Sequence, residues 1–190
     1  MPIPIGLGIP DYSQNVGSME NKGMEFTLNT VNFKTTDFSW NTNFNISFNK
    51  SKVLELKYVP IIDAAGIPSA GNLVRFAANQ PISSFYGYKY DGVDVNTGEI
   101  NYKDLDGNGM LSAGDRTFIG NPNPDYTFGF TNNFAYKNWY MDVLVTGSQG
   151  GDIYNASRFE LEMMDDHKNQ STIVLNRWKT PGDITNVPKA

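Results

Sequence analysis

The clearest pattern in this sequence is an alternation of apolar and polar residues along four segments. In Phe38–Asn49, aromatic and aliphatic side chains occupy one parity and serine and asparagine the other, and Thr42 is the polar residue that interrupts the apolar set. A period of two is the side-chain period of a β-strand. The same alternation runs through Met24–Asn32, Tyr126–Tyr136 and Trp139–Thr146. The pattern therefore predicts four amphipathic strands.

Short polar connections join these strands into two pairs. Phe33–Asp37 lies between the first two strands and Lys137–Asn138 between the last two. Connections of this length predict two antiparallel hairpins. Large aromatic residues flank both turns, namely Phe33, Phe38, Trp40, Phe134, Tyr136, Trp139 and Tyr140. Aromatic rings at strand ends are typical of the interfacial girdle of a membrane β-barrel, whereas in a soluble protein such rings are core residues.

The two faces of the longest strand indicate two different environments. Its polar positions carry no charge and its apolar positions are rich in aromatic rings, as in a barrel strand between hydrocarbon and a wet interior. A long hairpin of a soluble β-sandwich shows the same alternation, so this segment alone leaves both interpretations open. We predict an all-β fold: an incomplete antiparallel membrane β-barrel segment over residues 1–190, with long extracellular loops and one or two short helices.

The segment between the hairpins has another character. Leu54–Asp125 is rich in Gly, Pro, Asn and Asp, with short apolar stretches at Val74–Ala77 and Phe85–Tyr90. Long segments without strong periodicity are usually functional excursions. After the second hairpin, Asp152–Asp165 has the spacing of a short amphipathic helix, and Thr172–Trp178 predicts a further helical turn.

The lengths of the connections also predict sidedness. Outer-membrane barrels keep short turns in the periplasm and long loops outside the cell. We therefore expect Lys34–Asp37 and Lys137–Asn138 to be periplasmic. Gly66–Ala78 and Asp91–Asp125 should then be extracellular.

Composition supports an all-β protein and excludes several functions. Charged residues make up 18% of the chain, below the roughly 25% of soluble domains. A net charge of -5 offers no electrostatic basis for binding nucleic acid. The chain has no run of about 18 apolar residues that would predict a transmembrane helix, and no cysteine for disulfides or thiolate metal sites. Met1–Ile5 lacks the pattern of a signal peptide, so we expect any export signal to lie elsewhere.

The segment Asp104–Asp115 carries a metal-binding pattern. Numbered from its first residue, it places oxygen donors at the EF-hand loop positions 1, 3, 5, 7, 9 and 12, which are Asp104, Asp106, Asn108, the carbonyl of Met110, Ser112 and Asp115. Gly109 occupies position 6, where the loop turns sharply. The pattern predicts a structural Ca²⁺ site.

Two departures from the EF-hand pattern leave an alternative open. Position 12 is Asp rather than Glu, which shortens the reach of the last ligand, and Gly98–Lys103 predicts a turn and strand rather than a helix. Asp-Gly and Asn-Gly are also common turn dipeptides. The alternative is therefore a pair of polar turns.

Nothing in the sequence predicts catalysis. His167 is the only histidine, and it lies in a polar run without a positioned nucleophile. Gly147–Gly150 lacks the spacing of a nucleophile elbow. Tyr86, Tyr88 and Tyr90 offer either a stacking surface for a sugar or ordinary strand packing. We predict that the protein is not an enzyme.

Several motifs follow one another along the chain in a characteristic order: Asn15–Phe26, Gln80–Val93, Gly98–Gly109, Asp115–Tyr126, Gly151–Asn155 and Asn176–Asp183. In this order and spacing they resemble the late barrel region of SusC/RagA-type TonB-linked outer-membrane proteins. The resemblance implies a barrel of about 22 strands with an N-terminal plug, a size class of outer-membrane transporters. It implies that this chain is a fragment of such a barrel, without the plug and the closing strands.

The resemblance also implies a function and partners. It implies import of glycan or peptide oligomers across the outer membrane of a Gram-negative cell. TonB would energise the import through a region absent here, and a SusD-like surface lipoprotein would cap the barrel, which sits in outer-membrane lipid. The alternative from another class is a soluble, secreted, calcium-stabilised β-domain, such as an adhesin or a carbohydrate-binding module.

Overall fold

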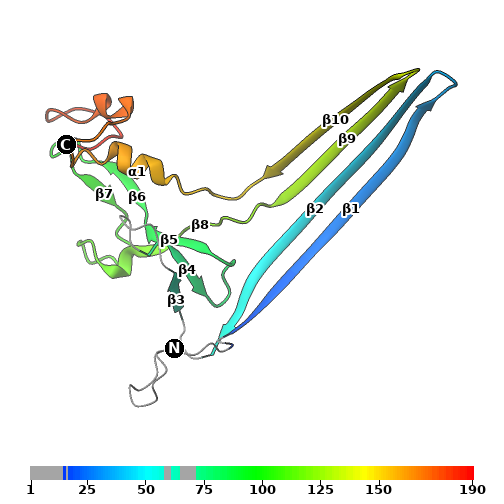
Figure 1. The fold of residues 1–190 in the computed structure, drawn as a ribbon. Helices are drawn as coiled ribbons and strands as arrows, with labels where there is room; N and C mark the ends of the chain where they lie inside the picture. Colours follow the sequence, from blue (N-terminus) through cyan, green and yellow to red (C-terminus); the bar gives the residue numbers. More distant parts are fainter. Residues whose placement is uncertain (1–14, 16, 58–60, 65–71) are drawn as a thin grey trace, which may run out of the picture. The chain divides into compact units, whose positions relative to one another are not determined.

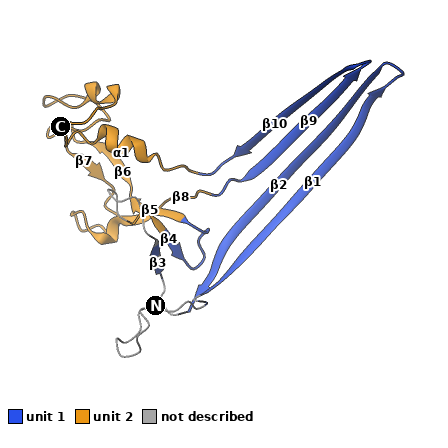
Figure 2. Ribbon diagram, viewed as in Figure 1, with its two compact units in different colours: residues 1–63, 75–83, 123–151 blue, residues 64–74, 84–122, 152–190 orange. Residues whose placement is uncertain are grey.

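The computed structural model describes residues 15, 17–57, 61–64 and 72–190. These residues form two compact units, each described by itself (Figure 2). Unit 1 comprises residues 1–63, 75–83 and 123–151, and unit 2 comprises residues 64–74, 84–122 and 152–190.

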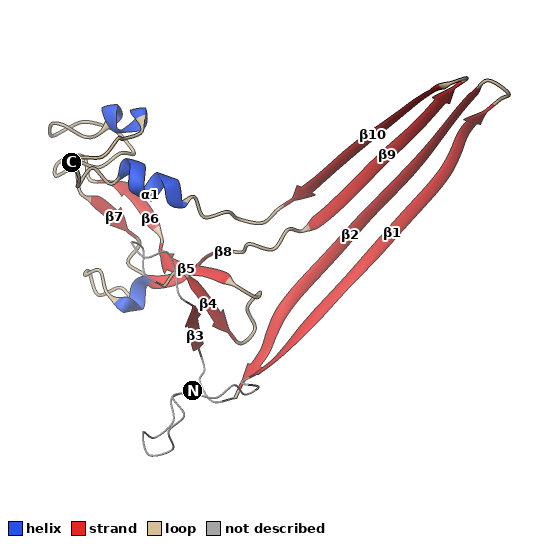
Figure 3. Cartoon of the chain, in the orientation of Figure 1, coloured by secondary structure: helices blue, strands red, loops and turns tan. Residues whose placement is uncertain are grey.

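Most of the regular structure is β-strand (Figure 3). The strands are β1 (Gly17–Lys34), β2 (Phe38–Leu56), β3 (Ile61–Ala64), β4 (Val74–Ala77), β5 (Ser84–Tyr88), β6 (Tyr90–Val93), β7 (Ile100–Tyr102), β8 (Arg116–Gly120), β9 (Tyr126–Tyr136) and β10 (Trp139–Gln149). The described helices are α1 (Ala156–Glu162) and the 3₁₀ turns η2 (Ala113–Asp115) and η3 (Thr172–Asn176). The predicted antiparallel all-β fold with short helical segments is confirmed.

Unit 1 is dominated by a four-stranded sheet in the order β1-β2-β9-β10 (Figure 1). All neighbouring strands are antiparallel, so both predicted hairpins are confirmed. The central pairing of β2 with β9 places Phe38 opposite Tyr136 and therefore brings both short turns to the same end of the sheet. Its two outer strands do not pair with each other, so the sheet is open, as expected of an incomplete barrel.

The register gives this sheet two chemically distinct faces, because directly opposed residues of neighbouring strands share a face. The apolar face carries Met24, Phe26, Leu28, Trp40, Phe44, Ile46, Phe48, Phe128, Phe130, Phe134, Met141, Val143 and Val145. The polar face carries Thr27, Asn29, Ser39, Asn41, Asn43, Asn45, Ser47, Thr131, Asn133, Asp142 and Thr146. The alternation read from the sequence is therefore kept across all four strands with few exceptions. Thr30, Thr42 and Asn132 lie on the apolar face, and Val31, Tyr140 and Leu144 lie on the polar face.

Aromatic contacts link the central strands on the apolar face. Trp40 stacks on Phe134 with ring centroids 5.7 Å apart, and Phe44 meets Phe130 edge-on at 6.5 Å. Cross-strand aromatic pairs of this kind stabilise antiparallel sheets beyond the area they bury. The face as a whole stays open, since Phe26 is 55% exposed. An open apolar surface of this extent marks a contact with a membrane or another protein.

Strands β1 and β2 are longer than the alternation predicted. They pair with each other from Lys34–Ser39 near the turn to Gly17–Leu56 at the far end. The sequence analysis assigned Leu54 onward to the excursion, and that boundary was wrong by a few residues. Mutual pairing extends both strands into a stretch where the local pattern is already irregular.

Unit 2 is built from short antiparallel strand pairs, helix α1 and irregular loops. Strands β5 and β8 pair antiparallel, as do β6 and β7. The backbone N–H of Asp152 donates to the carbonyl of Asn121 at 2.7 Å. The backbone N–H of Asn121 in turn donates to the carboxylate of Asp152. These contacts join two of the motifs singled out in the sequence.

The helical predictions are confirmed with shorter bounds. Helix α1 occupies the middle of the predicted Asp152–Asp165 segment, and its N-cap is Asn155, whose Oδ1 accepts the N–H of Arg158 at 3.3 Å. η3 occupies the start of the predicted Thr172–Trp178 turn. No helix in the described part of the chain is long and apolar enough to cross a bilayer. Part of the predicted extracellular segment Gly66–Ala78, residues 66–71, lies outside the described residues.

Candidate functional site

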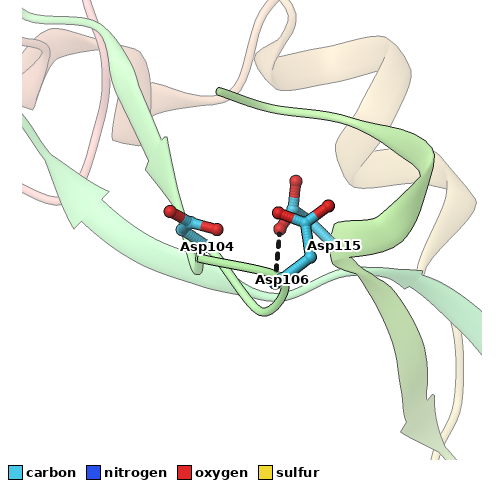
Figure 4. A group of neighbouring side chains, drawn as sticks. All are labelled: Asp104, Asp106 and Asp115. Carbon is cyan, nitrogen blue, oxygen red and sulfur yellow. Dashed lines mark hydrogen bonds between the residues drawn. The ribbon is translucent and has the colours of Figure 1, made fainter. Parts of the chain in front are cut away.

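The loop Asp104–Asp115 connects β7 to β8 in unit 2 and brings three carboxylates together. One oxygen from each of Asp104, Asp106 and Asp115 lies within 4.8 Å of the other two. Figure 4 shows Asp104 on one side and Asp106 with Asp115 on the other. The loop therefore gathers the residues at positions 1, 3 and 12, as a calcium-binding loop requires.

Asp104 shapes the turn inside this loop. Its carboxylate oxygens accept the backbone N–H groups of Gly107 at 2.6 Å and of Gly109 at 2.8 Å. Both glycines have positive φ, +74° and +75°, a conformation that a residue with a Cβ rarely adopts. Gly109 thus has the turn role that the sequence predicted, and Gly107 forms the turn indicated by the Asp106-Gly107 dipeptide.

The other predicted ligands lie next to Asp106. Its Oδ2 accepts hydrogen bonds from Asn108 Nδ2 at 2.9 Å and from Ser112 Oγ at 3.0 Å. The backbone N–H of Met110 donates to Asn108 Oδ1 at 2.7 Å and its side chain is exposed. This bond involves the N–H of Met110 and not the carbonyl oxygen that was predicted as a ligand. The side chains of Asp106, Asn108 and Ser112 are therefore joined directly by hydrogen bonds.

Asp115 is the buried anchor of the loop, with an exposed fraction of 0%. Its Oδ2 accepts the N–H of Ser112 and its Oδ1 that of Leu105, both at 2.7 Å. These backbone donors, that of Ser112 most strongly, hold the pKa of Asp115 below its ordinary value. Asp115 also forms a capping box with Ser112 around η2. This structural role was not predicted from the sequence, although a Ser followed three residues later by an acidic residue is its signature.

The negative charge of the loop has no protein counter-ion among the described residues, because none of their ion pairs involves Asp104, Asp106 or Asp115. Lys103, the neighbour of Asp104 in sequence, is paired with Asp91, with Nζ and Oδ1 3.6 Å apart. Neighbouring carboxylates repel one another unless a cation or protons intervene. Carboxylate, amide, hydroxyl and carbonyl oxygens are the donors that suit Ca²⁺, so the residues present fit that ion.

Tyr86 and Tyr88, two of the three tyrosines considered as a sugar-stacking surface, are engaged in strand packing. Tyr90 is 46% exposed, and its hydroxyl donates to the carbonyl of Asn186 at 3.3 Å. Tyr86 meets Phe118 edge-on at 5.2 Å, and the Arg116 guanidinium lies 5.0 Å from the centre of the Tyr86 ring. Tyr88 packs against Tyr102 at 5.6 Å. Tyr86 therefore has little free ring surface, and Tyr88 is the more exposed of the two, at 37%.

A second organising residue of unit 2, Trp178, was missed by the sequence analysis. Its Nε1–H donates to the carbonyl of Val95 at 3.0 Å, and its ring lies over Gly98. The backbone N–H of Lys189 donates to the Gly98 carbonyl at 3.0 Å. The turn after β6 is thus fastened to the last part of the chain. The available signal was a lone tryptophan in a polar segment, since so large a ring is seldom left exposed.

No family model matches this chain. It is 37% identical over 209 residues to TonB-dependent receptor P3 of Formosa agariphila, an alignment that covers 99% of this chain and 20% of the relative. It is 30% identical over 164 residues to TonB-dependent receptor SusC of Bacteroides thetaiotaomicron, covering 80% of this chain and 16% of the relative. The chain thus spans about a fifth of the length of these curated relatives.

Solved structures agree with the sequence comparison. The RagAB peptide transporter matches with a TM-score of 0.79 and 25% identity, over 99% of this chain and 22% of that chain. The RagAB peptide importer in its closed-closed state matches with a TM-score of 0.79 and 26% identity. The open, two-faced sheet, the order of the motifs and both sets of similarities have one explanation. This chain corresponds to a barrel segment of a TonB-dependent receptor of the SusC/RagA type.

Proposed function

We propose that this chain supplies part of the wall of an outer-membrane transporter that imports glycan or peptide oligomers. In the complete protein, TonB drives the import from the periplasm, and a surface lipoprotein of the SusD type covers the extracellular opening. The chain itself performs no chemical reaction.

The observation that carries this proposal is the four-stranded sheet of unit 1. One face is aromatic and aliphatic, which suits the hydrocarbon of a bilayer, and the other is rich in Asn, Ser and Thr, which suits a water-filled interior. The names of the relatives support it as well, because they are receptors and a peptide transporter. A soluble adhesin or carbohydrate-binding module would bury such an aromatic face within its own core.

Deletion and complementation of the full-length gene test the proposal. Membrane fractionation should place the protein in the outer membrane, and the deletion strain should lose growth on one class of oligomer while it still grows on the corresponding monomer. The wild-type gene should restore that growth. Recovery of the protein in the soluble fraction, or unchanged growth on a panel of glycan and peptide oligomers, would overturn the proposal.

We further propose that the acidic loop binds one Ca²⁺ ion that rigidifies it. Asp104, Asp106, Asn108, Ser112 and Asp115 would supply side-chain oxygens, with Ser112 acting directly or through water. Met110 would supply its carbonyl oxygen. The support is the convergence of three carboxylates that have no ion-pair partner among the described residues. The role of the ion would be structural, because it would hold together carboxylates that otherwise repel one another.

Calorimetric titration of the detergent-solubilised full-length protein tests the calcium proposal. The wild type should bind calcium at a site that the double variant Asp104→Ala with Asp106→Ala lacks. Asp166→Ala is the matched control, since it removes an exposed carboxylate outside the loop. Equal calcium uptake by wild type and double variant would identify the loop as a pair of polar turns.

A further inference from the structure

The apolar face of the sheet in unit 1 contains a polar group of side chains that the transport function does not explain. Thr42 interrupts the apolar alternation of β2, and the residue directly opposite it on β9 is Asn132. Thr30 is opposite Thr42 on β1. A row of polar residues therefore crosses three strands within a face that is otherwise aromatic and aliphatic.

These residues form a continuous chain of hydrogen bonds. Thr30 Oγ1 donates to Asn32 Oδ1 at 2.9 Å, and Asn32 Nδ2 donates to Thr42 Oγ1 at 2.5 Å. Thr42 Oγ1 donates to Asn132 Oδ1 at 2.7 Å, and Trp40 Nε1 donates to the same oxygen at 2.9 Å. We name these five residues the Asn132 cluster.

A β-bulge brings Asn32 into this cluster. The pairing of β1 with β2 shifts between Val31 and Phe33, so Asn32 has no direct partner on β2. The extra residue at a bulge re-aims its side chain, and here the Asn32 amide reaches Thr42. The central member of the cluster is well covered, since Asn132 is 8% exposed.

The cluster lies at a depth where unpaired polar groups are costly. Thr42 is about 13 Å along the strand from Phe38, taking about 3.3 Å per residue. If the aromatic residues at the turns mark the interface, this places the cluster within an apolar band about 25 Å tall. An amide or hydroxyl exposed to hydrocarbon without a partner strongly destabilises the fold, and the hydrogen bonds within the cluster supply such partners.

We infer that the Asn132 cluster is a hydrocarbon-facing hydrogen-bond network that pins the bulged strand β1 to β2 and β9. Trp40 is accordingly a positioning residue whose indole N–H is directed into the sheet, rather than an anchor to the lipid headgroups. This inference rests on the proposed function in one respect, namely that the apolar face meets lipid.

A double-mutant cycle on the full-length protein tests the inference. The variants are Thr42→Val, Asn132→Leu and their combination, and the readout is the midpoint of urea unfolding in lipid vesicles. Each single variant should lower the midpoint, because it leaves partners unpaired in hydrocarbon. The combined variant should lose clearly less than the sum of the two, because it removes both ends of a bond.

The polar face of the same sheet provides the control. Asn43 Nδ2 donates to Asn29 Oδ1 across β1 and β2 on the wetted side. Asn29→Ala and Asn43→Ala should each change the midpoint little, because water replaces the lost partner. Losses that add up in the Thr42–Asn132 cycle would overturn the inference, and so would single variants as mild as the controls.

Failure of the inference is distinguishable from failure of the proposed function. Fractionation of the wild-type protein decides whether it resides in the outer membrane. An outer-membrane protein with additive losses refutes the cluster and leaves the transporter proposal intact.

Discussion

The backbone N–H of Lys137 donates a hydrogen bond to the carbonyl oxygen of Asp37 at 2.8 Å. This contact joins the turn between β9 and β10 to the turn between β1 and β2. The strand pairing places the two short connections at the same end of the sheet, and this hydrogen bond shows that they also contact each other. Any assignment of sidedness must therefore place both turns in the same compartment.

Sidedness can be tested with single cysteines in the full-length protein. Asn96→Cys lies in the hairpin connection between β6 and β7, within the predicted extracellular segment Asp91–Asp125, and Asn138→Cys lies in the short turn between β9 and β10. We expect a membrane-impermeant maleimide to label the first variant on intact cells and the second only after lysis. The opposite pattern would invert the assignment. Labelling of both variants on intact cells would show that the two positions are not separated by a membrane.

A pair of lysine substitutions tests which face meets lipid. Phe44→Lys places a charge on the apolar face and should destabilise the folded barrel by about 2–4 kcal/mol, the range for lysine near the bilayer midplane. Asn45→Lys places the same charge on the polar face, one residue away, and should be tolerated. Unfolding midpoints in lipid vesicles measure both. Equal losses would contradict the assignment of the two faces.

A glycine substitution tests how much the packing of the Trp178 ring against Gly98 stabilises unit 2. Gly98 has φ +72°, and a Cβ there would lie 2.5 Å from the Trp178 ring. Gly98→Ala combines backbone strain with overpacking and should cost about 2 kcal/mol or more. Gly92→Ala is the control, because its φ is +108° but nothing lies within 4 Å of the added carbon. Limited proteolysis should cut the first variant faster than the second, and equal rates would mean that the ring moves aside.

The pKa of Asp115 predicts how the acidic loop responds to acid. Hydrogen bonds from backbone N–H groups hold this pKa below its ordinary value of 3.8. A carboxylate with a lowered folded-state pKa stabilises the fold fully above the unfolded value, and this stabilisation is lost as pH falls through the folded value. In calcium-free buffer the amide exchange of Leu105 and Ser112, corrected for intrinsic rates, should therefore show constant protection from pH 7 to 5. Protection should fall only below pH 3.8. Loss of protection near pH 6 would contradict this account.

Local patterns predicted the strands of unit 1 well. Thr42 was visible as a break in the apolar alternation, but the partner that completes it, Asn132, is 90 residues away. Periodicity gives the face of a residue and not the strand it will pair with. The two hairpins could therefore be predicted separately, whereas the β2–β9 pairing and the bulge at Asn32 could not.

The acidic loop was predictable because its donors and glycines lie within one short segment. Spacing alone placed Asp104, Asp106 and Asp115 together. The spacing did not reveal that Asp115 would be buried and would accept hydrogen bonds from Leu105 and Ser112. Burial depends on how the loop closes against its surroundings. The contact of Trp178 was not predicted for the same reason as the β2–β9 pairing, because its partner Val95 is 83 residues earlier in the chain.

The pairing of β2 with β9 also constrains the order of events during synthesis. The β1–β2 hairpin can form as soon as it is made, but the indole of Trp40 must wait for Asn132, 92 residues later. Until then one whole edge of β2 offers unpaired N–H and carbonyl groups to any other strand. Closing so long a loop is slow compared with forming a hairpin. Newly made chain therefore spends an interval in which the unpaired edge of β2 can pair with a strand other than β9.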